Sequence, residues 1–135
     1  MSRRTARESA FKTIYEIPFH VDETPADIIN FTSKAEDGKL NSQVDTDYFL
    51  NVTSTCFENL LQIDEKISAS LKDWTIERIS KIDLSILRLA VCEIMFIDDI
   101  PYQVSINEAV ELAKKYSDDE SPSFINGVLA SAVSK

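Results

Sequence analysis

Apolar residues in this chain recur three and four positions apart, and almost nowhere do they alternate strictly with polar residues. The first spacing is typical of amphipathic helices, whereas strict alternation would indicate strands. The pattern therefore predicts an all-α protein. The clearest run predicts a long helix with Asp45 as its N-cap, and it leaves open a kink or a new start at 62–64. This run consists of Phe49, Val52, Cys56, Leu60, Ile63, Ile67 and Leu71.

A first helix is predicted over residues 3–17. At about 100° per residue, Arg4, Phe11 and Tyr15 fall on one side of it, with Arg7 beside them. We expect this basic and aromatic strip to stay accessible to solvent. The opposite side is predicted to be a buried stripe formed by Ala6, Ala10, Ile14 and Ile17.

Several later helices are predicted from residues that favour helix starts. Thr24 before Pro25 indicates a short helix that fades before Gly38. The pair Trp74 and Thr75 indicates another start, in which Trp74 packs against Ile79 as a hydrophobic staple.

Three further starts are predicted in the second half of the chain. Asp83 is expected to cap one helix, and 105–108 (SINE) has the form of a capping box for the next. Ser121 followed by Pro122 is expected to cap the last helix, which would bury Ile125, Val128 and Leu129. Gly127 is predicted to lie inside this last helix at a point where another backbone approaches closely.

Composition limits the class of protein. A chain of 135 residues with 44% apolar and 27% charged residues fits one folded domain. No apolar run approaches the roughly 18 residues of a membrane span, and the amino terminus lacks the apolar stretch of a secretory signal. We therefore expect a cytoplasmic protein with no membrane association.

Catalytic and cofactor chemistry has little support in the sequence. Cys56 and Cys92 lie in apolar runs without CxxC spacing, so we expect two reduced, buried thiols. His20 is the only histidine, and it cannot complete a metal site or a triad alone. The only glycines, Gly38 and Gly127, are too far apart for a phosphate-binding glycine loop. No metal and no cofactor is expected.

A local positive charge stands out from an acidic chain. The formal net charge is −9 at pH 7, yet residues 1–12 hold four basic residues and one acidic residue, a net charge of +3. Because the local field governs binding more than the mean charge does, Arg3, Arg4 and Arg7 are candidate ligands of phosphate. The alternative is a solvated terminal tail with no partner.

Five phrases of the sequence resemble one known family. They are 3–8 (RRTARE), 83–93 (DLSILRLAVCE), 100–101 (IP), 106–114 (INEAVELAK) and 121–129 (SPSFINGVL). In this order and spacing they resemble the NusB family of bacterial transcription antitermination factors. The resemblance spans nearly the whole chain, although it is thin between residues 18 and 45.

The resemblance implies a fold, an activity and a set of partners. The fold is about seven helices in two small packed bundles, forming a single RNA-binding domain over residues 1–135. The activity is binding, not catalysis: a heterodimer with NusE, a small-subunit ribosomal protein, would grip single-stranded boxA RNA of nascent transcripts, chiefly from ribosomal RNA operons. Together with other Nus factors on the RNA polymerase elongation complex, it would suppress premature termination.

The resemblance also nominates residues for each partner, and departs from the family pattern at three positions. Serine stands at 105 and 117 where alanine and glycine are usual, and Cys92 replaces a frequent tyrosine; we expect these changes to affect packing and caps. The implied RNA-binding residues are Arg3, Arg4, Arg7, Arg78, Glu120, Ser121 and Phe124, and the implied NusE-binding residues are Tyr15, Phe19 and Asp83.

Two other functions remain open at this point. A homodimeric adaptor whose assembly covers the arginine face would bind little RNA. A NusB-like domain also precedes the catalytic domain of certain ribosomal RNA cytosine methyltransferases. The chain length and the lack of a glycine-rich loop for S-adenosylmethionine make this enzymatic reading the least expected of the three.

Overall fold

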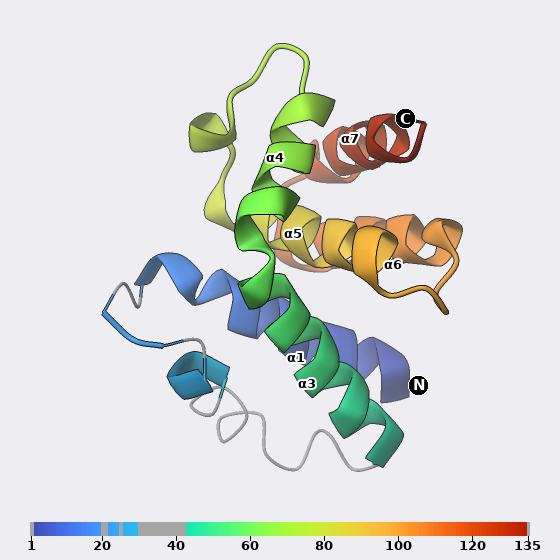
Figure 1. Cartoon of the computed structure of the whole chain (residues 1–135). Coiled ribbons are helices and arrows are strands. Elements are labelled where there is room, and N and C mark those ends of the chain that lie inside the picture. Colours follow the sequence, from blue (N-terminus) through green and yellow to red (C-terminus); the bar gives the residue numbers. More distant parts are fainter. Residues whose placement is uncertain (1, 20–21, 25, 30–42, 135) are drawn as a thin grey trace.

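Regular structure in the described residues is entirely helical, as predicted. The computed structural model describes residues 2–19, 22–24, 26–29 and 43–134 (Figure 1). Its main elements are α1 (Ser2–Tyr15), η1 (Ile17–Phe19), α3 (Gln43–Glu58), α4 (Leu60–Ser70), η2 (Ile76–Arg78), α5 (Lys81–Phe96), α6 (Tyr102–Tyr116) and α7 (Ser121–Val133).

Helix α5 lies at the centre of the molecule and joins two groups of helices. It packs against α1 and α3 on one side and against α4, α6 and α7 on the other (Figure 1). Helices α1 and α3 also pack on each other, and α7 packs on both α4 and α6. The two predicted bundles are therefore confirmed, with α5 shared between them.

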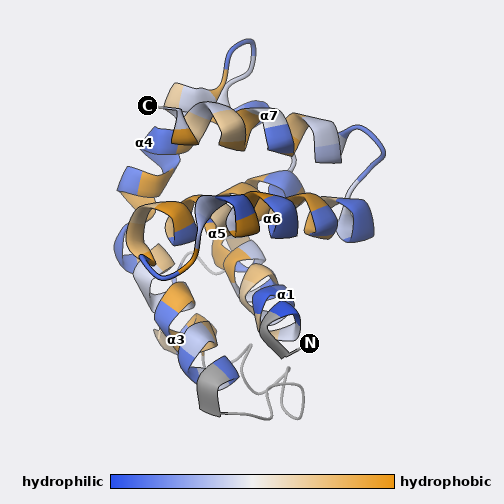
Figure 2. Cartoon of the chain, turned by 90° about the vertical axis from the view of Figure 1, so that its right-hand side faces the viewer, coloured by the Kyte–Doolittle hydropathy of each residue, from blue (hydrophilic) through white to orange (hydrophobic). Residues whose placement is uncertain are grey.

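One hydrophobic core runs through both groups. Ile14 of α1, Phe49 of α3, Ile63 of α4, Leu87 of α5 and Leu129 of α7 are all completely buried. Burial of one such side chain contributes about 1.5–3 kcal/mol to folding. In Figure 2, the outer helices carry both hydrophobic and hydrophilic residues, as expected when one face is buried. The central helix α5 differs, since its residues 85–93 are all buried.

The predicted long helix is broken, but not where a break was considered. It ends at Glu58 and restarts at Leu60, because Asn59 has a non-helical backbone and its side-chain amide donates to the carbonyl of Thr55 at 2.8 Å. A polar side chain that bonds to the local backbone in this way competes with the helix. Asp45 is not an N-cap, since α3 begins at Gln43 and Asp45 is buried in its first turn.

The start of α5 also differs from the prediction. Ser80 is the N-cap, and its hydroxyl accepts a hydrogen bond from the Asp83 amide at 3.1 Å. Asp83 is therefore inside the first turn and does not cap the helix. Thr75 precedes only the short helix η2, and Ile79 ends that helix instead of lying within it.

The predicted capping box at 105–108 is wrong, because α6 begins earlier. Pro101 precedes the helix at Tyr102, so Ser105 and Glu108 lie within it and their side chains are free for other bonds. The last helix begins at Ser121, but Ser121 does not cap it: the N-cap residue is Glu120, whose side chain makes no capping bond. The carboxylate of Asp118, two residues earlier, accepts from the amides of Glu120 and Ser121 at 3.1 Å each. Ile125, Val128 and Leu129 are buried, as predicted.

Smaller predictions have mixed outcomes. Gly127 lies within α7, but a Cβ there would meet nothing within 4 Å, so the predicted close approach of another backbone is wrong. The Thr24 cap is confirmed, since its hydroxyl accepts from the Asp27 amide at 3.2 Å. Pro25, the segment up to Gly38, and His20 lie outside the described residues.

Cys56 and Cys92 are buried and are not joined by a disulfide, as predicted. The neighbouring Cys56 thiol and burial raise the pKa of Cys92. Over the described ranges, we find no cluster of three or more His, Cys, Asp or Glu suited to a metal ion. Nor does this part of the chain contain a helix with the length and apolar character that crossing a bilayer requires.

Candidate nucleic-acid interface

Arg4 is the exposed arginine of the predicted RNA face. It lies in the first turn of α1, and its side chain is 57% exposed. Its Nε and Nη2 donate to Oε1 and Oε2 of Glu108 on α6 at 3.0 and 2.7 Å. This paired geometry lowers the pKa of Glu108 below its ordinary value. The side chain of Arg3 lies outside the described residues.

Arg7 is not accessible, contrary to the prediction. The residue is only 5% exposed, and its Nε donates to Oε2 of Glu93 on α5 at 2.8 Å. The guanidinium carbon also lies 5.6 Å from the centre of the Tyr48 ring. Arg7 lies three residues before Ala10 and seven before Ile14, a helical spacing that places it on the buried side of α1. The sequence contains this spacing, but arginine is seldom buried, so the residue was assigned to the accessible side.

Glu93 is the centre of a buried polar network. Its carboxylate accepts from Arg7, from the hydroxyl of Tyr48 on α3, and from the hydroxyl of Ser105 on α6 at 2.8 Å. The serine found at position 105, where alanine is usual in the resembling family, therefore donates one of these bonds. A buried charge persists only when it is paired and hydrogen-bonded, and this one is both. The network ties α1 to three other helices.

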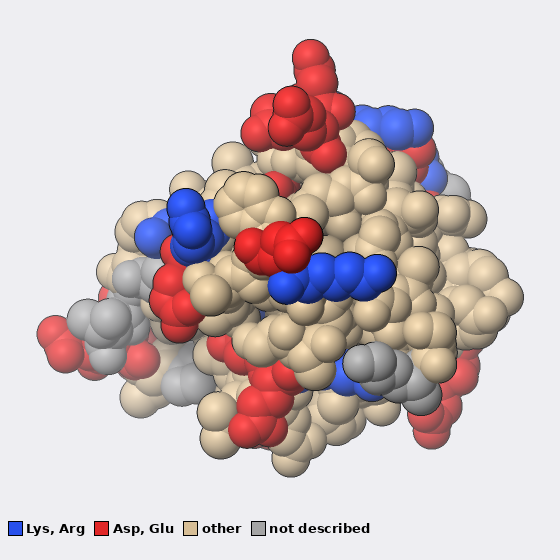
Figure 3. All heavy atoms as spheres, turned by 90° about the horizontal axis from the view of Figure 1, so that it is seen from above, with Lys and Arg blue, Asp and Glu red and all other residues tan. Residues whose placement is uncertain are grey.

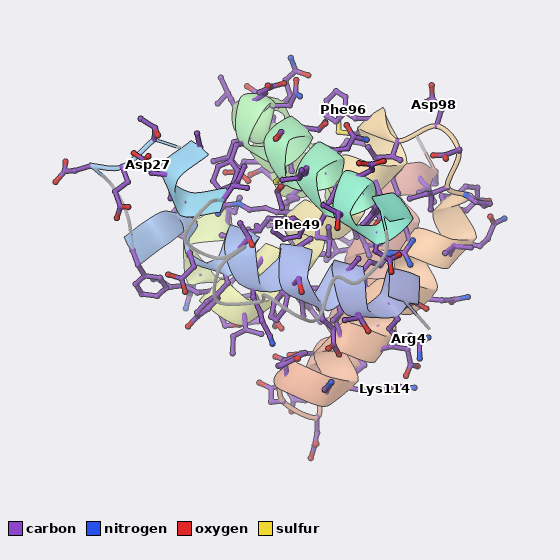
Figure 4. All side chains as sticks on the ribbon, turned by 90° about the horizontal axis from the view of Figure 1, so that it is seen from below. Arg4, Asp27, Phe49, Phe96, Asp98 and Lys114 are labelled. Atoms are coloured by element: carbon purple, nitrogen blue, oxygen red, sulfur yellow. The ribbon has the colours of Figure 1, made fainter. Side chains whose placement is uncertain are left out.

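A shallow hollow of about 340 Å³ lies between α1 and α6. Figure 4 shows Arg4 at the start of α1 and Lys114 on α6, on the same side of the molecule. Four basic and three acidic residues line the hollow, a net charge of +1. Within residues 1–12, the charges of Arg4 and Arg7 are each paired with a carboxylate in the folded protein. The lining residues are Arg4, Arg7, Glu8, Glu108, Glu111, Leu112, Lys114 and Lys115.

A second, larger groove brings the other predicted RNA residues together. It has a volume of about 720 Å³, and Arg78, Glu120, Ser121 and Phe124 all line it. The sequence did not single out Trp74 for this site. Its ring is 53% exposed and lies edge-on to Phe124, with 6.4 Å between ring centres. The signal in the sequence that could have identified this residue was a tryptophan placed between two polar residues, at 73–75.

The groove is acidic despite Arg78. The guanidinium carbon of Arg78 lies 5.9 Å from the centre of the Trp74 ring. Four carboxylates line the groove beside this single cation, a net charge of −3. On the face that Figure 3 draws, seen from above the view of Figure 1, small basic areas lie next to acidic ones and no extended basic area is visible. The carboxylates of the groove are Asp83, Asp118, Asp119 and Glu120.

Asp83 and Ser121 are buried at the base of this groove. The Asp83 carboxylate accepts from the hydroxyls of Ser117 and Ser121 at 2.7 and 2.9 Å. These bonds join the start of α5 to the end of α6 and the start of α7. Asp83 is 8% exposed and Ser121 is 3% exposed, so both residues shape the groove from below. The serine at 117 supplies one of the bonds.

Tyr15 and Phe19, which were nominated for NusE, form an aromatic cluster at the end of α1. Their ring centres are 5.3 Å apart, and Phe19 is 53% exposed. Phe11 extends the cluster to Tyr116 of α6, with 5.1 Å between ring centres. Asp83, the third nominated residue, lines the acidic groove instead.

Comparison with known proteins agrees with this architecture. The model of the NusB family matches residues 4–134. A transcription antitermination protein NusB from Natranaerobius thermophilus is 51% identical, with 96% of this chain and 92% of the relative covered. The corresponding protein of Clostridium novyi is 43% identical, with 98% of each chain covered.

Solved structures show the same fold. NusB of T. maritima has a TM-score of 0.86 and 33% identity, over 98% of this chain and 91% of that chain. A chain from a crystal structure of antitermination factors NusB and NusE in complex with dsRNA has a TM-score of 0.87 and 25% identity, over 98% and 96%. From the family match and these relatives, the chain belongs to the NusB family.

Proposed function

We propose that this chain is a transcription antitermination factor that binds boxA RNA of nascent transcripts as a heterodimer with NusE. Its relatives are named as antitermination proteins, and a chain of the same fold is found with NusE and dsRNA. Membership of this family makes the activity binding and not catalysis. We place it in the cytoplasm, on RNA polymerase elongation complexes with other Nus factors, chiefly at ribosomal RNA operons.

The observation that carries the proposal is the groove in which Trp74 and Phe124 lie edge-to-face beside Arg78. Proteins that read single-stranded RNA stack its unpaired bases on aromatic rings and on guanidinium planes. The negative charge of this groove disfavours phosphates, so it suits bases more than the RNA backbone.

The RNA backbone is assigned to the face of α1. Arg4 is exposed there, and Arg3 lies beside it in the sequence. Guanidinium groups bind phosphate oxygens without reading sequence. Arg7 and Ser121, which are buried, would support the interface by holding α1 and the start of α7 in place, and Glu120 would line the groove.

NusE is assigned to the aromatic cluster at the end of α1. An exposed Phe19 against Tyr15 offers the kind of aromatic surface that protein interfaces use. Asp83 would contribute from the buried floor of the neighbouring groove, through its bonds to Ser117 and Ser121.

A gel-shift experiment tests this proposal. The chain is titrated against a boxA-like RNA and a scrambled RNA, each with and without NusE. We expect stronger retention of the boxA-like RNA when NusE is present. Equal retention of both RNAs under every condition would reject the proposed function, and a light-scattering dimer that persists with NusE in excess would favour the homodimeric adaptor.

Single substitutions test which residues contact the RNA backbone and which contact its bases. Arg4→Ala should reduce the slope of log affinity against log salt by up to about 0.7, the share of one full phosphate contact on single-stranded RNA. Phe124→Ala should weaken binding with little change in that slope, because stacking is not electrostatic. Lys66→Ala on α4, which lines neither the hollow nor the groove, is the matched control for loss of a positive charge.

A further inference from the structure

The hollow between α1 and α6 has an unusual charge arrangement. Each of its three exposed cations is bonded to a carboxylate of the same chain, and two of these pairs link α1 to α6. The pairs are Arg4 with Glu108 at 2.7 Å, Lys115 with Glu8 at 2.6 Å, and Lys114 with Glu111 at 3.3 Å.

Glu108 occupies the part of Arg4 that a phosphate would use. Both carboxylate oxygens accept from one edge of the guanidinium group, formed by Nε and Nη2. This is the two-bond geometry by which arginine also holds phosphate. An RNA phosphate must therefore displace Glu108 from this edge, or bind the outer nitrogens of a guanidinium whose charge is already compensated.

Of these carboxylates, Glu108 is held in its ionised form by its arginine partner. The hydrogen bond and charge of Arg4 lower the pKa of Glu108, and Glu8 raises the pKa of Lys115. Glu108 is only 17% exposed at the side chain, whereas Arg4 is 57% exposed. Glu108 is thus the more enclosed partner of the pair, and Arg4 is the more exposed one.

We propose that Glu108 and Glu8 are internal competitors of RNA phosphate, which occupy Arg4 and Lys115 and restrain sequence-independent binding of RNA to this face. This inference rests on the proposed function, because it assigns the phosphate-binding part of that site. It explains how a basic amino terminus is kept from binding polyanions generally. Without a partner, the surface around the hollow between α1 and α6 is close to neutral. Tight RNA binding then also requires the groove of Trp74 and Phe124 and a protein partner.

Removal of one competing carboxylate should strengthen RNA binding. Glu108→Gln keeps the size of the side chain and removes its charge. We expect the chain without NusE to bind about two- to fivefold more tightly, the range that exposed ion pairs support. Because phosphate contacts carry no sequence information, a boxA-like RNA and a scrambled RNA should gain by the same factor. The salt slope should become steeper by up to about 0.7.

The experiment measures fluorescence anisotropy of both labelled RNAs with Glu108→Gln and Glu8→Gln. Glu65→Gln on α4 is the control, since it changes the net charge equally but lies outside the hollow. In an Arg4→Ala background, Glu108→Gln should bring no gain, because the competition acts through Arg4. Thermal unfolding confirms that each variant is folded.

A heparin column separates failure of this inference from failure of the proposed function. Glu108→Gln and Glu8→Gln should elute at higher salt than Glu65→Gln, whether or not the chain prefers boxA RNA. If they elute together with Glu65→Gln, or if Glu108→Gln binds RNA no more tightly than the unchanged chain, the inference is overturned. Weaker binding by Glu108→Gln would indicate instead that Glu108 orients Arg4 for phosphate. Loss of boxA preference alone would reject only the proposed function.

Discussion

Replacement of Arg7 by methionine tests whether this residue belongs to the interior or to the RNA surface. Methionine keeps most of the length of the side chain, so little cavity is created and the main loss is the positive charge. Glu93 is left with a buried negative charge and only the hydroxyls of Tyr48 and Ser105 as donors. Its side chain is 1% exposed, so water cannot replace the lost partner.

The expected cost is large. Breaking a buried ion pair from one side typically destabilises a protein by about 3–5 kcal/mol. The unfolding entropy of about 2.1 cal/mol/K per residue, taken over a chain of 135 residues, converts this cost to a fall in Tm of about 10–18 °C. The assay is thermal unfolding followed by circular dichroism, repeated in urea to obtain the free energy of unfolding.

Two further variants make the result decisive. Arg4→Met removes the same charge from an exposed site and should leave Tm nearly unchanged. Adding Glu93→Gln to Arg7→Met should recover part of the lost stability, because a neutral amide does not require a cation. If Arg7→Met unfolds at the same temperature as the unchanged chain while its RNA affinity falls more than that of Arg4→Met, Arg7 faces the RNA and the reasoning is refuted.

Two other predictions concern single carboxylates. Asp83→Ala should lower the free energy of unfolding by about 1–3 kcal/mol in urea denaturation, because the carboxylate that accepts from both Ser117 and Ser121 is lost. Equal stability would show that water, or Asp118, which also accepts from Ser121 at 2.9 Å, replaces it. Because Arg4 lowers the folded-state pKa of Glu108, the pair should stabilise the protein above the ordinary pKa of 4.5, and this contribution should be lost as pH falls through the lower folded value. A stability difference between Glu108→Gln and the unchanged chain that persists at acid pH would contradict this.

The helical class and the buried faces were readable from the order of residues. Ala10 and Ile14 in α1, or Ile125 and Leu129 in α7, reveal a buried side through spacing alone, because helical periodicity is a local property. Helix starts were less predictable, since several residues able to cap lie close together. Ser80 caps α5 and Asp83 does not, because the Asp83 carboxylate accepts from the hydroxyls of Ser117 and Ser121 instead.

Charged residues mark the limit of what the order of residues can reveal here. The cluster of Arg3, Arg4 and Arg7 predicted a basic face, and the family phrases predicted its partner class. Only packing brings Glu93 to Arg7 across 86 positions, and Glu108 to Arg4 across 104. Whether a charge binds a partner or an internal carboxylate depends on such distant contacts. These contacts arise when the helices assemble, so only the tertiary structure shows that Arg7 is buried against Glu93 whereas Arg4 is exposed beside Glu108.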